Sequence, residues 1–466
     1  MSTLRFFKHY IRVPFVALGA VEFLCNIISI YAASYVRFSF DGVDIASIFS
    51  GLEVRAILFA GVMLLCMIAT GLYQTTMREG MFGVLLRLVV SYFIGVVVLA
   101  FIFYSFPAFF LGRGVLVLAV IFSFAAIVLL RIIFFRTDPN IFKRRVLILG
   151  SGKRASSIAD LRRKVDQFGF CVVGYVHLRG SDDVIDQSQI LKLKMPLKEF
   201  CFANEVDEIV IAIDDRRKGF PVKDLLDCKM SGIEILDLAS FFERETGKIR
   251  LDQIHPSWLM LSDGFNKSGL QEFVKRIFDL VSGLILLTLT WPLMLFTVLA
   301  IKLEDGIKAP VIFRQIRIGE EGRPYKIFKF RSMRVDAEKD GKAQWAVKGD
   351  SRITRVGNFI RKTRFDELPQ IFNVVKGNMS FVGPRPERPE FVVMLSEKIE
   401  YFEERHRVKP GITGWAQIRY PYGASDKDAL EKLQYDLYYV KNQSLFLDFL
   451  ILLQTVEVIL FGKGAR

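Results

Sequence analysis

The sequence predicts a membrane α-helical bundle, followed by an α/β Rossmann-like domain and by a monotopic α/β domain with a re-entrant membrane helix near residues 273–302. Three observations predict this fold class. Four long apolar stretches open the chain, a strand, a glycine turn and a helix follow from Arg144, and a proline interrupts a later apolar run between two basic flanks. The predicted domains are 1–140 for the bundle, 141–240 for the Rossmann-like domain, 241–266 for a linker and 267–466 for the last domain.

The composition indicates a membrane protein that handles acidic partners. The 466 residues are 52% hydrophobic and include 43 Phe, and mean hydropathy is +0.33, which is more apolar than a soluble protein requires. A net charge of +14 suits anionic lipid, phosphate ligands or nucleic acid, which composition does not separate. The five Cys form no CxxC pair, so we expect neither structural zinc nor a disulfide framework.

Each of the four apolar stretches is long enough, or nearly so, to cross a hydrocarbon core of roughly 30 Å. They are residues 13–36, 56–73, 88–110 and 115–135. Basic residues flank them on the sides that place both ends of the bundle in the cytoplasm. These are Arg5, Lys8, Arg12, Arg78, Arg87, Arg136, Lys143, Arg144 and Arg145. Glu22 lies inside the first stretch, where an acid is either functional or simply solvated near an interface.

A doubly wound α/β pattern is predicted after the bundle. A buried strand at 146–149 leads into the glycine turn 150–152 and a helix from about Ala155. Further strands are expected at 171–176, 208–213 and 233–236. The turn matches GxGxxA, which could place a pyrophosphate on a helix N-terminus. No acidic residue ends a second strand at the usual distance, so a plain tight turn is favoured over a nucleotide site.

The fifth apolar run, 280–301, is long enough to span a membrane, but both of its flanks are basic and require the cytoplasmic side. Lys275 and Arg276 precede it, and Lys302 begins a strongly basic segment. Pro292 breaks the helix at its middle. A re-entrant helix with its break at Pro292 satisfies charge and topology together, and an ordinary kinked span is the alternative.

Two adjacent acids, Asp366 and Glu367, lie between a basic cluster at 361–364 and an apolar helical run that Gly377 closes. Cations neutralise phosphoryl oxygens, a carboxylate can attack phosphorus or hold a divalent metal, and a helix N-terminus adds its positive end. Pro369 suits a first helical turn. The alternative is that the two acids only stabilise a helix start.

Four motifs occur in order in the last part of the chain. They are KFRSM at 329–333, DELPQ at 366–370, GNMSFVGPRP at 377–386 and KPGITGWAQ at 409–417. Together they resemble the bacterial sugar transferase family, the polyprenyl-phosphate glycosyl-1-phosphate transferases of exopolysaccharide and O-antigen synthesis. The upstream layout resembles the long members, which carry four membrane helices and a Rossmann-like domain before the catalytic domain. The resemblance makes 267–466 the expected phosphoglycosyl transferase domain.

The resemblance implies transfer of sugar 1-phosphate from a nucleotide diphosphate sugar, most often UDP-linked, to undecaprenyl phosphate, with release of UMP. It implies that Asp366 is the nucleophile of a covalent aspartyl-phosphosugar intermediate and that Glu367 holds Mg²⁺, although spacing alone would allow the roles to be exchanged. A two-step route is attractive because two anionic phosphates repel each other. The expected phosphate-binding residues are Lys329, Arg331, Arg361 and Arg385.

The expected partners are the sugar donor, the undecaprenyl phosphate acceptor and the bacterial inner membrane, with the catalytic domain on its cytoplasmic face. Nucleic acid is not expected, and homo-oligomerisation is left open. A membrane-tethered Rossmann enzyme that modifies nucleotide sugars is a less favoured alternative. Such an enzyme needs a Tyr and a Lys in a YxxxK pattern, and Arg179 stands where the Lys would follow Tyr175. A non-enzymatic lipid-binding scaffold would not require DELPQ. The apolar run 446–461 is short for a span, so it should pack on the catalytic domain or lie in the interface.

Overall fold

The computed structural model describes residues 3–6, 9–39, 51–73, 80–136, 143–159, 161, 169–177, 183–193, 195–214, 220–254, 265, 268–334, 352–420, 423 and 425–460. Lys8, Arg78, Arg179 and residues 255–264 and 266 of the predicted linker lie outside these residues. The chain divides into an N-terminal unit, 1–254, and a C-terminal unit, 255–466. The N-terminal unit holds the helical bundle and the α/β domain.

The described residues contain five helices that are long and apolar enough to cross a membrane. They are α1 (Val13–Phe38), α3 (Leu52–Ala69), α4 (Gly80–Ser105), α5 (Arg113–Arg136) and α11 (Gly269–Asp305). The first four confirm the four predicted membrane helices. A short antiparallel hairpin, β1 (Thr3–Phe6) and β2 (His9–Arg12), precedes α1.

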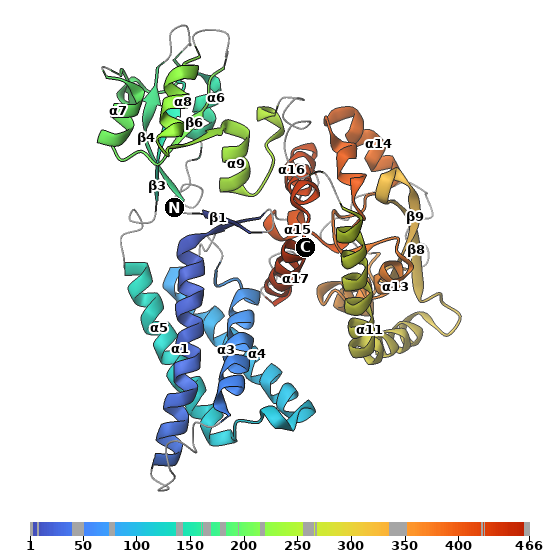
Figure 1. Cartoon of the computed structure of the whole chain (residues 1–466). Helices are drawn as coiled ribbons and strands as arrows, with labels where there is room; N and C mark the ends of the chain where they lie inside the picture. Colours follow the sequence, from blue (N-terminus) through green and yellow to red (C-terminus); the bar gives the residue numbers. More distant parts are fainter. Residues whose placement is uncertain are drawn as a thin grey trace. The chain divides into compact units, whose positions relative to one another are not determined.

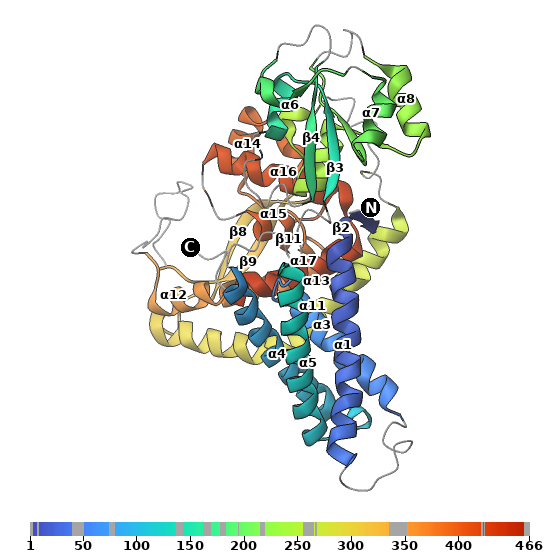
Figure 2. The ribbon, with the colours of Figure 1, turned by 90° about the vertical axis from the view of Figure 1, so that its left-hand side faces the viewer.

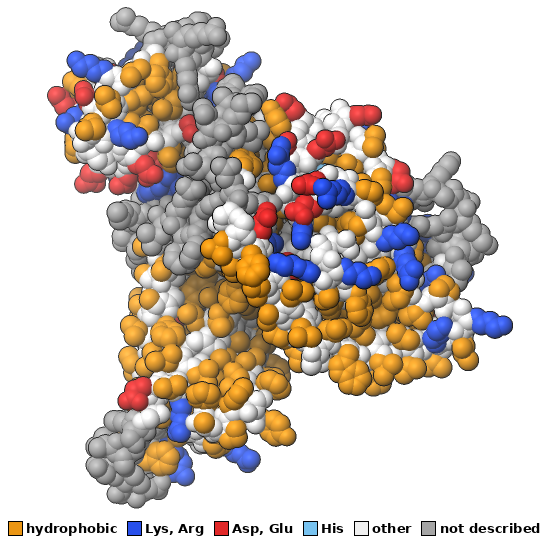
Figure 3. Space-filling model, turned by 45° about the vertical axis from the view of Figure 1, so that its right-hand side comes forward, with side chains coloured by type: hydrophobic (Ala, Val, Ile, Leu, Met, Phe, Trp, Pro, Cys, Tyr) orange, Lys and Arg blue, Asp and Glu red, His pale blue; other side chains and the backbone are white. Residues whose placement is uncertain are grey.

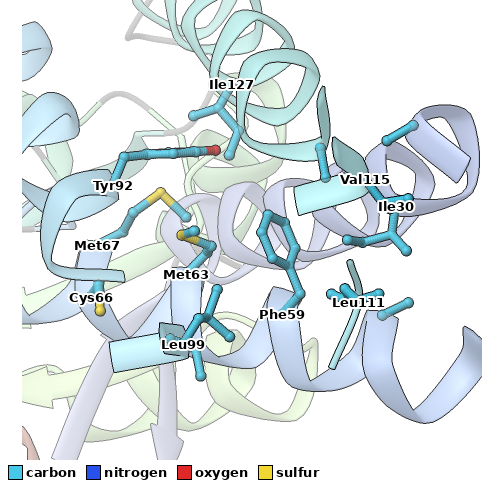
Figure 4. Close-up of a cluster of buried hydrophobic side chains, with 14 of the residues drawn as sticks. Ile30, Phe59, Met63, Cys66, Met67, Tyr92, Leu99, Leu111, Val115 and Ile127 are labelled. Atoms are coloured by element: carbon cyan, nitrogen blue, oxygen red, sulfur yellow. The ribbon is translucent and has the colours of Figure 1, made fainter. Parts of the chain in front are cut away.

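Side chains from all four helices form the core of the bundle (Figure 4). Phe59, Met63 and Met67 of α3 are buried at its centre, with Ile30 of α1 and Leu99 of α4. Elsewhere the helices leave many apolar side chains exposed. Apolar residues on both the inner and outer surface are what a lipid-facing bundle requires.

Helix α4 begins well before its predicted start at residue 88, because Arg87 belongs to the helix. The side chain of Arg87 is buried, at 1% exposure, and its Nη1 atom donates a hydrogen bond to the Thr70 carbonyl over 2.6 Å. The sequence reading that placed Arg87 in a basic loop is therefore wrong. An arginine in a membrane helix is tolerated when backbone carbonyls of the bundle accept hydrogen bonds from its guanidinium group.

Glu22 is also fully buried, so the solvated reading of this residue is wrong. Its carboxylate forms an ion pair with Arg131 of α5, with 2.6 Å between Oε1 and Nε, and accepts a hydrogen bond from the Tyr73 hydroxyl. Arg131 also donates to the Leu72 carbonyl over 3.0 Å. Glu22 therefore links α1 to α5, which lie side by side in both ribbon views (Figures 1 and 2).

The α/β domain contains a five-stranded parallel sheet with strand order β5-β4-β3-β6-β7. The strands are β3 (Arg144–Leu149), β4 (Phe170–Val176), β5 (Ile190–Leu191), β6 (Glu208–Ile211) and β7 (Glu234–Asp237). The helices are α6 (Lys153–Ala159), α7 (Leu197–Ala203), α8 (Val222–Met230) and α9 (Leu238–Thr246). Helices cover both faces, α6 and α9 on one and α7 and α8 on the other (Figure 2). The doubly wound prediction is confirmed.

The predicted boundary at residue 240 is wrong, because α9 crosses it. Phe241 and Phe242 of this helix are fully buried in the core that α6 and the sheet share. The Phe241 ring also packs edge-on against Phe170 of β4, with 5.0 Å between ring centroids. The α/β domain therefore continues beyond residue 240, and the N-terminal unit extends to Ile254.

The C-terminal unit is built around α11, an antiparallel hairpin and a group of shorter helices. Its strands are β8 (Ile312–Ile318), β9 (Pro324–Phe330), β10 (Ser380–Val382) and β11 (Gly411–Thr413). Its other helices are α12 (Arg355–Lys362), η7 (Phe365–Glu367), α13 (Gln370–Lys376), α14 (Pro389–Lys398), η8 (Phe402–Arg407), α15 (Trp415–Arg419), α16 (Asp426–Asn442) and α17 (Leu445–Leu460).

Helix α11 contains Pro292 and is continuous, but it bends into two limbs that run in different directions (Figure 1). The first limb packs against α13 and β10, and the second limb buries Ile301 against Phe330 and Ile360. Glu304 near its end accepts hydrogen bonds from the backbone N–H groups of Arg355 and Val356. Both limbs are therefore fixed to the same unit.

Hydrophobic side chains dominate the part of the C-terminal unit that α11 forms, beside a row of Lys and Arg (Figure 3). Exposed apolar side chains of α11 include Leu284, Ile285, Leu289, Trp291 and Phe296. Helix α17 behaves differently, since it buries Leu447 and Ile451 and contacts β10, β11 and α15. Packing on the domain, one of the two expectations for 446–461, is what the structure shows for this helix.

Candidate active site

Three sequence-distant segments bring their charged side chains together in the C-terminal unit. Lys329 lies near the end of β9, Glu367 ends the 3₁₀ turn η7, and Arg385 follows β10. The Nζ atom of Lys329 lies 2.9 Å from Oε1 of Glu367, and Nη2 of Arg385 lies 3.4 Å from the same oxygen. Motifs KFRSM, DELPQ and GNMSFVGPRP therefore meet at one carboxylate.

The local backbone explains why the two acids lie where they do. Arg364 has a left-handed conformation, with φ of 61°, and turns the chain out of α12 into η7. Pro369 then caps α13, and Gly377 ends that helix with φ of 86°, a conformation that favours glycine. The acids thus lie in a tight turn just before a helix, close to the predicted helix start.

The two neighbouring carboxylates have opposite electrostatic environments. Burial raises the pKa of Asp366 to about 6, and the negative charge of Glu367 adds to that effect. Burial also opposes the charge on Glu367, but Lys329, Arg385 and Arg364 outweigh it and hold the pKa of Glu367 well below its ordinary value. Burial lowers the pKa of the Lys329 ammonium. Glu367 is therefore a fixed anion, and Asp366 is the acid that titrates near neutrality.

Asp366 and Glu367 also differ in their hydrogen-bond partners. Asp366 is only 8% exposed, and its Oδ1 atom has no hydrogen-bond partner among the described residues. An unpaired buried carboxylate oxygen is costly, and such groups occur where function requires them. Arg361 is close enough to lower the pKa of Asp366, although burial dominates.

Arg331 lies just beyond the end of β9, and in the described part of the chain neither carboxylate forms an ion pair with it. Its Nη1 atom is buried and lacks a hydrogen-bond partner within that part. Arg331 therefore stays a predicted phosphate ligand rather than a member of the charge cluster that the structure shows.

Sequence reasoning missed residues that hold the cluster in place. Arg364 belongs to the basic cluster 361–364 but is not among the predicted phosphate-binding residues, and its Nη1 atom lies 3.9 Å from Oε1 of Glu367. Asn373 ties α13 to β9, because its side chain donates to the Lys326 carbonyl and accepts from the Phe328 N–H. A polar amide inside an otherwise apolar helical run was the available signal for Asn373.

The loop that carries Arg385 is fixed from several sides. Arg405, which forms a buried ion pair with Asp436 over 2.7 Å, donates a hydrogen bond to the Arg385 carbonyl. Strands β10 and β11 pair in parallel next to it. The backbone around Gly383 and Gly411 is closely packed. A Cβ on Gly383 would lie 2.2 Å from the Lys409 carbonyl oxygen, and a Cβ on Gly411 would lie 2.1 Å from the backbone nitrogen of Gly383. The glycines of two motifs are therefore needed for this backbone contact.

Magnesium would have few protein ligands at this site. Among the described residues, no group of three or more His, Cys, Asp or Glu side chains could hold a metal ion. Asp366 and Glu367 offer two adjacent carboxylates, and Asp366 has a free oxygen. Mg²⁺ commonly takes one or two carboxylates and completes its shell with water and substrate phosphates, so the residues fit an ion that arrives with a diphosphate.

A membrane-anchored α/β unit in which a buried carboxylate and a largely buried one lie among fixed cations is suited to phosphate ester chemistry. Residues 270–462 match the bacterial sugar transferase family, and residues 68–219 match a family described as a CoA-binding domain. The chain is 36% identical over 331 residues to the UDP-glucose:undecaprenyl-phosphate glucose-1-phosphate transferase of Escherichia coli strain K12, which covers 69% of each protein. The chain therefore belongs to the bacterial sugar transferase family.

One further relative has a different donor in its name, and another is a much shorter protein. Identity is 43% over 253 residues to the UDP-N-acetylgalactosamine-undecaprenyl-phosphate N-acetylgalactosaminephosphotransferase of Aeromonas hydrophila, covering 54% of this chain and 58% of that protein. The uncharacterised sugar transferase EpsL of Bacillus subtilis strain 168 is 41% identical over 193 residues, which are 41% of this chain and 90% of EpsL. The chain thus spans somewhat over half the length of the Aeromonas relative.

The α/β domain does not fit the phosphates of coenzyme A at its glycine turn. The first backbone N–H groups of α6, from Lys153 and Arg154, donate to the Asp214 carboxylate over 2.9 and 2.8 Å. The Ser151 hydroxyl is hydrogen-bonded to Asp183. Two acids of the chain itself thus occupy the positions that a pyrophosphate would take.

Proposed function

We propose that the protein transfers sugar 1-phosphate from a UDP-sugar to undecaprenyl phosphate, releases UMP and so starts the assembly of an exopolysaccharide or O-antigen repeat unit. Family membership and the named activities of the relatives support the reaction class. The observation that carries the proposal is the buried Oδ1 of Asp366, which has no hydrogen-bond partner in the described part of the chain and lies beside a carboxylate that cations hold ionised.

The asymmetry of the two acids favours Asp366 as the nucleophile. Its oxygen attacks the phosphorus that bears the sugar, a new O–P bond forms, and the P–O bond to UMP breaks with its electron pair on UMP. An oxygen of the lipid phosphate then attacks the same phosphorus, and the Asp366–phosphorus bond breaks. The carboxylate is regenerated, and undecaprenyl diphosphate sugar is the product.

The surrounding residues stabilise and orient this chemistry. Lys329 and Arg385 hold Glu367 in place, and Arg361 adds positive charge near Asp366. With Arg331 they form the proposed binding surface for the diphosphate, where a guanidinium fork suits phosphate oxygens. A magnesium ion held by Glu367 would neutralise diphosphate oxygens as UMP leaves.

We also propose that α11 is re-entrant, so that the site faces the cytoplasm where nucleotide sugars are made. The packing of both limbs on one unit supports this topology, as does the bend of the helix that contains Pro292. Single cysteines at positions 272 and 305, in a background without native Cys, should both be protected from an impermeant thiol reagent in sealed cells. Labelling of position 305 alone from outside would show a complete span.

The donor is best identified with the purified full chain in nanodiscs. UDP-N-acetylgalactosamine, UDP-glucose and UDP-galactose are offered with undecaprenyl phosphate, and UMP is measured. We expect UMP and a lipid-linked sugar with at least one donor. Absence of both products with every donor, from protein that is folded and membrane-bound, would contradict the proposal.

A further inference from the structure

The first limb of α11 makes polar contacts with both halves of the site. One half is β10, whose chain continues directly to Arg385. The other is α13, which follows the turn that carries Asp366 and Glu367. Neither the reaction nor the motifs account for these contacts.

Asp279 and Lys275, one helical turn apart on α11, hold β10. Oδ1 of Asp279 accepts hydrogen bonds from the Ser380 hydroxyl over 2.9 Å and from the Phe381 N–H over 3.1 Å. Asp279 is 2% exposed. Lys275 donates to the Val382 carbonyl over 3.3 Å and forms a 2.6 Å ion pair with Asp448 of α17. Every residue of β10 therefore contacts this face of α11.

Arg276, next to Lys275, holds α13. Its Nη1 and Nη2 atoms donate to the carbonyls of Val374 and Val375, both over 2.6 Å. These carbonyls lie in the last turn of α13, where a cation also favours the helix dipole. Further along, a Cβ on Gly283 would be in ordinary contact with Val375 and with Phe381. The same helix face thus reaches both halves.

The two halves meet at a contact that a small displacement would break. Arg385 lies 3.4 Å from Glu367, at the long end of hydrogen-bonding distance, whereas Lys329 lies at 2.9 Å. A relative shift of about 1 Å between β10 and α13 would remove the Arg385 contact, and misplacements of that size can cost about 100-fold in rate.

We propose that Lys275, Arg276 and Asp279 are positioning residues through which the membrane helix sets the distance between Arg385 and the Asp366–Glu367 pair. The expected effect on the rate rests on the proposed function. The expected effect on the structure of the segment 380–388 does not. Asp279 is the most informative member, because its carboxylate oxygen holds β10 through two hydrogen bonds and does not touch the reacting groups.

The test compares Asp279→Ala with Asp279→Asn in full-length protein in nanodiscs. Alanine removes the acceptor, whereas the asparagine Oδ1 can still accept from Ser380 and Phe381. Glu272→Ala, an exposed acid on the same helix, is the matched control. Hydrogen exchange of the segment 380–388 and the kinetics of UMP release are measured for each variant.

We expect Asp279→Ala to speed amide exchange in 380–388 and to lower kcat about 10- to 100-fold with little change in KM for the donor. Asp279→Asn and Glu272→Ala should match the parent within about twofold. Ser380→Ala removes only one of the two donors, so its effect should be smaller, and it keeps the test valid if Asp279→Ala folds poorly.

Unchanged exchange in the Asp279→Ala and Ser380→Ala variants would overturn the positioning role, whether or not any donor is turned over. Faster exchange with an unchanged kcat would overturn it too, because the loop would then not govern the rate. A parent protein without UMP release would instead count against the proposed function, and the exchange data would still decide the structural part.

Discussion

Both α/β regions of this chain have acidic side chains where phosphate could bind. The two regions differ in the hydrogen-bond partners of those acids. In the N-terminal domain, Asp214 accepts the first N–H groups of α6 and so satisfies the helix end internally. In the C-terminal unit, Lys329 and Arg385 satisfy Glu367, while Oδ1 of Asp366 is left without a partner within the described residues.

A glycine turn before a helix therefore does not by itself predict a phosphate site. What matters is whether the chain supplies its own anion. A satisfied carboxylate is a structural cap, whereas a buried, unsatisfied one beside fixed cations is a candidate for chemistry. The same substitution in the two regions should therefore have very different consequences.

The largest expected effect is that of Asp366→Asn. An amide keeps the shape of the side chain but cannot form the mixed anhydride, so UMP release should fall by about 1,000-fold or more. Thermal unfolding should show no loss of stability, because no hydrogen bond to Oδ1 is removed. Retention of more than a few per cent of activity would rule out covalent catalysis at Asp366.

Glu367→Gln should have the next largest effect and should act through the metal. Loss of the charge removes the attraction of Lys329 and Arg385 and weakens the proposed magnesium ligand, so about 10- to 100-fold more Mg²⁺ should be needed. The measurement is a magnesium titration of UMP release. A titration that matches the parent protein would assign the metal to other residues.

The raised pKa of Asp366 predicts the pH dependence of the first step. A carboxyl group with a pKa of about 6 is half ionised at that pH and mostly ionised above it. UMP release should therefore rise with pH through about 6 and then level off. At pH 5 the rate should be about tenfold below the plateau. Measuring single-turnover UMP release without lipid avoids titration of the acceptor phosphate. A flat profile between pH 5 and 7 would contradict the assignment.

Removal of the N-terminal unit should affect the chemistry less. A fragment that begins at about Phe265 retains every motif and all the contacts of the site, so its kcat should stay within about tenfold of the full chain. The 193-residue match to the uncharacterised sugar transferase EpsL covers 90% of that protein, so EpsL has little sequence beyond the matched part. A folded, membrane-bound fragment with no activity on the donors of the full chain would show that the N-terminal unit is required.

The smallest effect on catalysis should come from Asp214→Asn, the counterpart of Asp366→Asn. We expect less than a twofold change in UMP release and a loss of about 1 kcal/mol in the stability of the α/β domain, because a helix cap is weakened. Thermal unfolding and the UMP assay measure the two effects. A large loss of activity with an unchanged melting temperature would mean that this turn serves the reaction after all.

Periodicity and motif order predicted much of the fold from the sequence. Three of the four apolar stretches and the strands at 146–149 and 171–176 are found within a few residues of their predicted bounds, whereas α4 begins at Gly80 instead of residue 88. Charge alone gave the wrong prediction at Arg87, because this side chain donates a hydrogen bond to the carbonyl of Thr70 at the end of α3 and is buried. The linker was placed too early because Phe241 and Phe242 complete a core formed by residues far away in sequence.

The sequence predicted the side chains that form the charge cluster but not the difference between its two acids. The motifs identified Asp366, Glu367, Lys329 and Arg385, yet adjacent acids look equivalent in a sequence. Only the structure shows that cations converge on Glu367 and leave an oxygen of Asp366 unpaired. The hydrogen bonds between α11 and β10 could not be predicted from the sequence either, because Asp279 and Ser380 are 101 positions apart.

Mass spectrometry can detect the proposed covalent bond between Asp366 and the sugar phosphate. The full-length protein is incubated with its UDP-sugar and Mg²⁺ without undecaprenyl phosphate, and then digested. We predict about one UMP released per site and a sugar-phosphate adduct on the peptide that contains Asp366, which disappears when the lipid is added. Protein that turns over with lipid but releases no UMP and carries no adduct without it would contradict the claim.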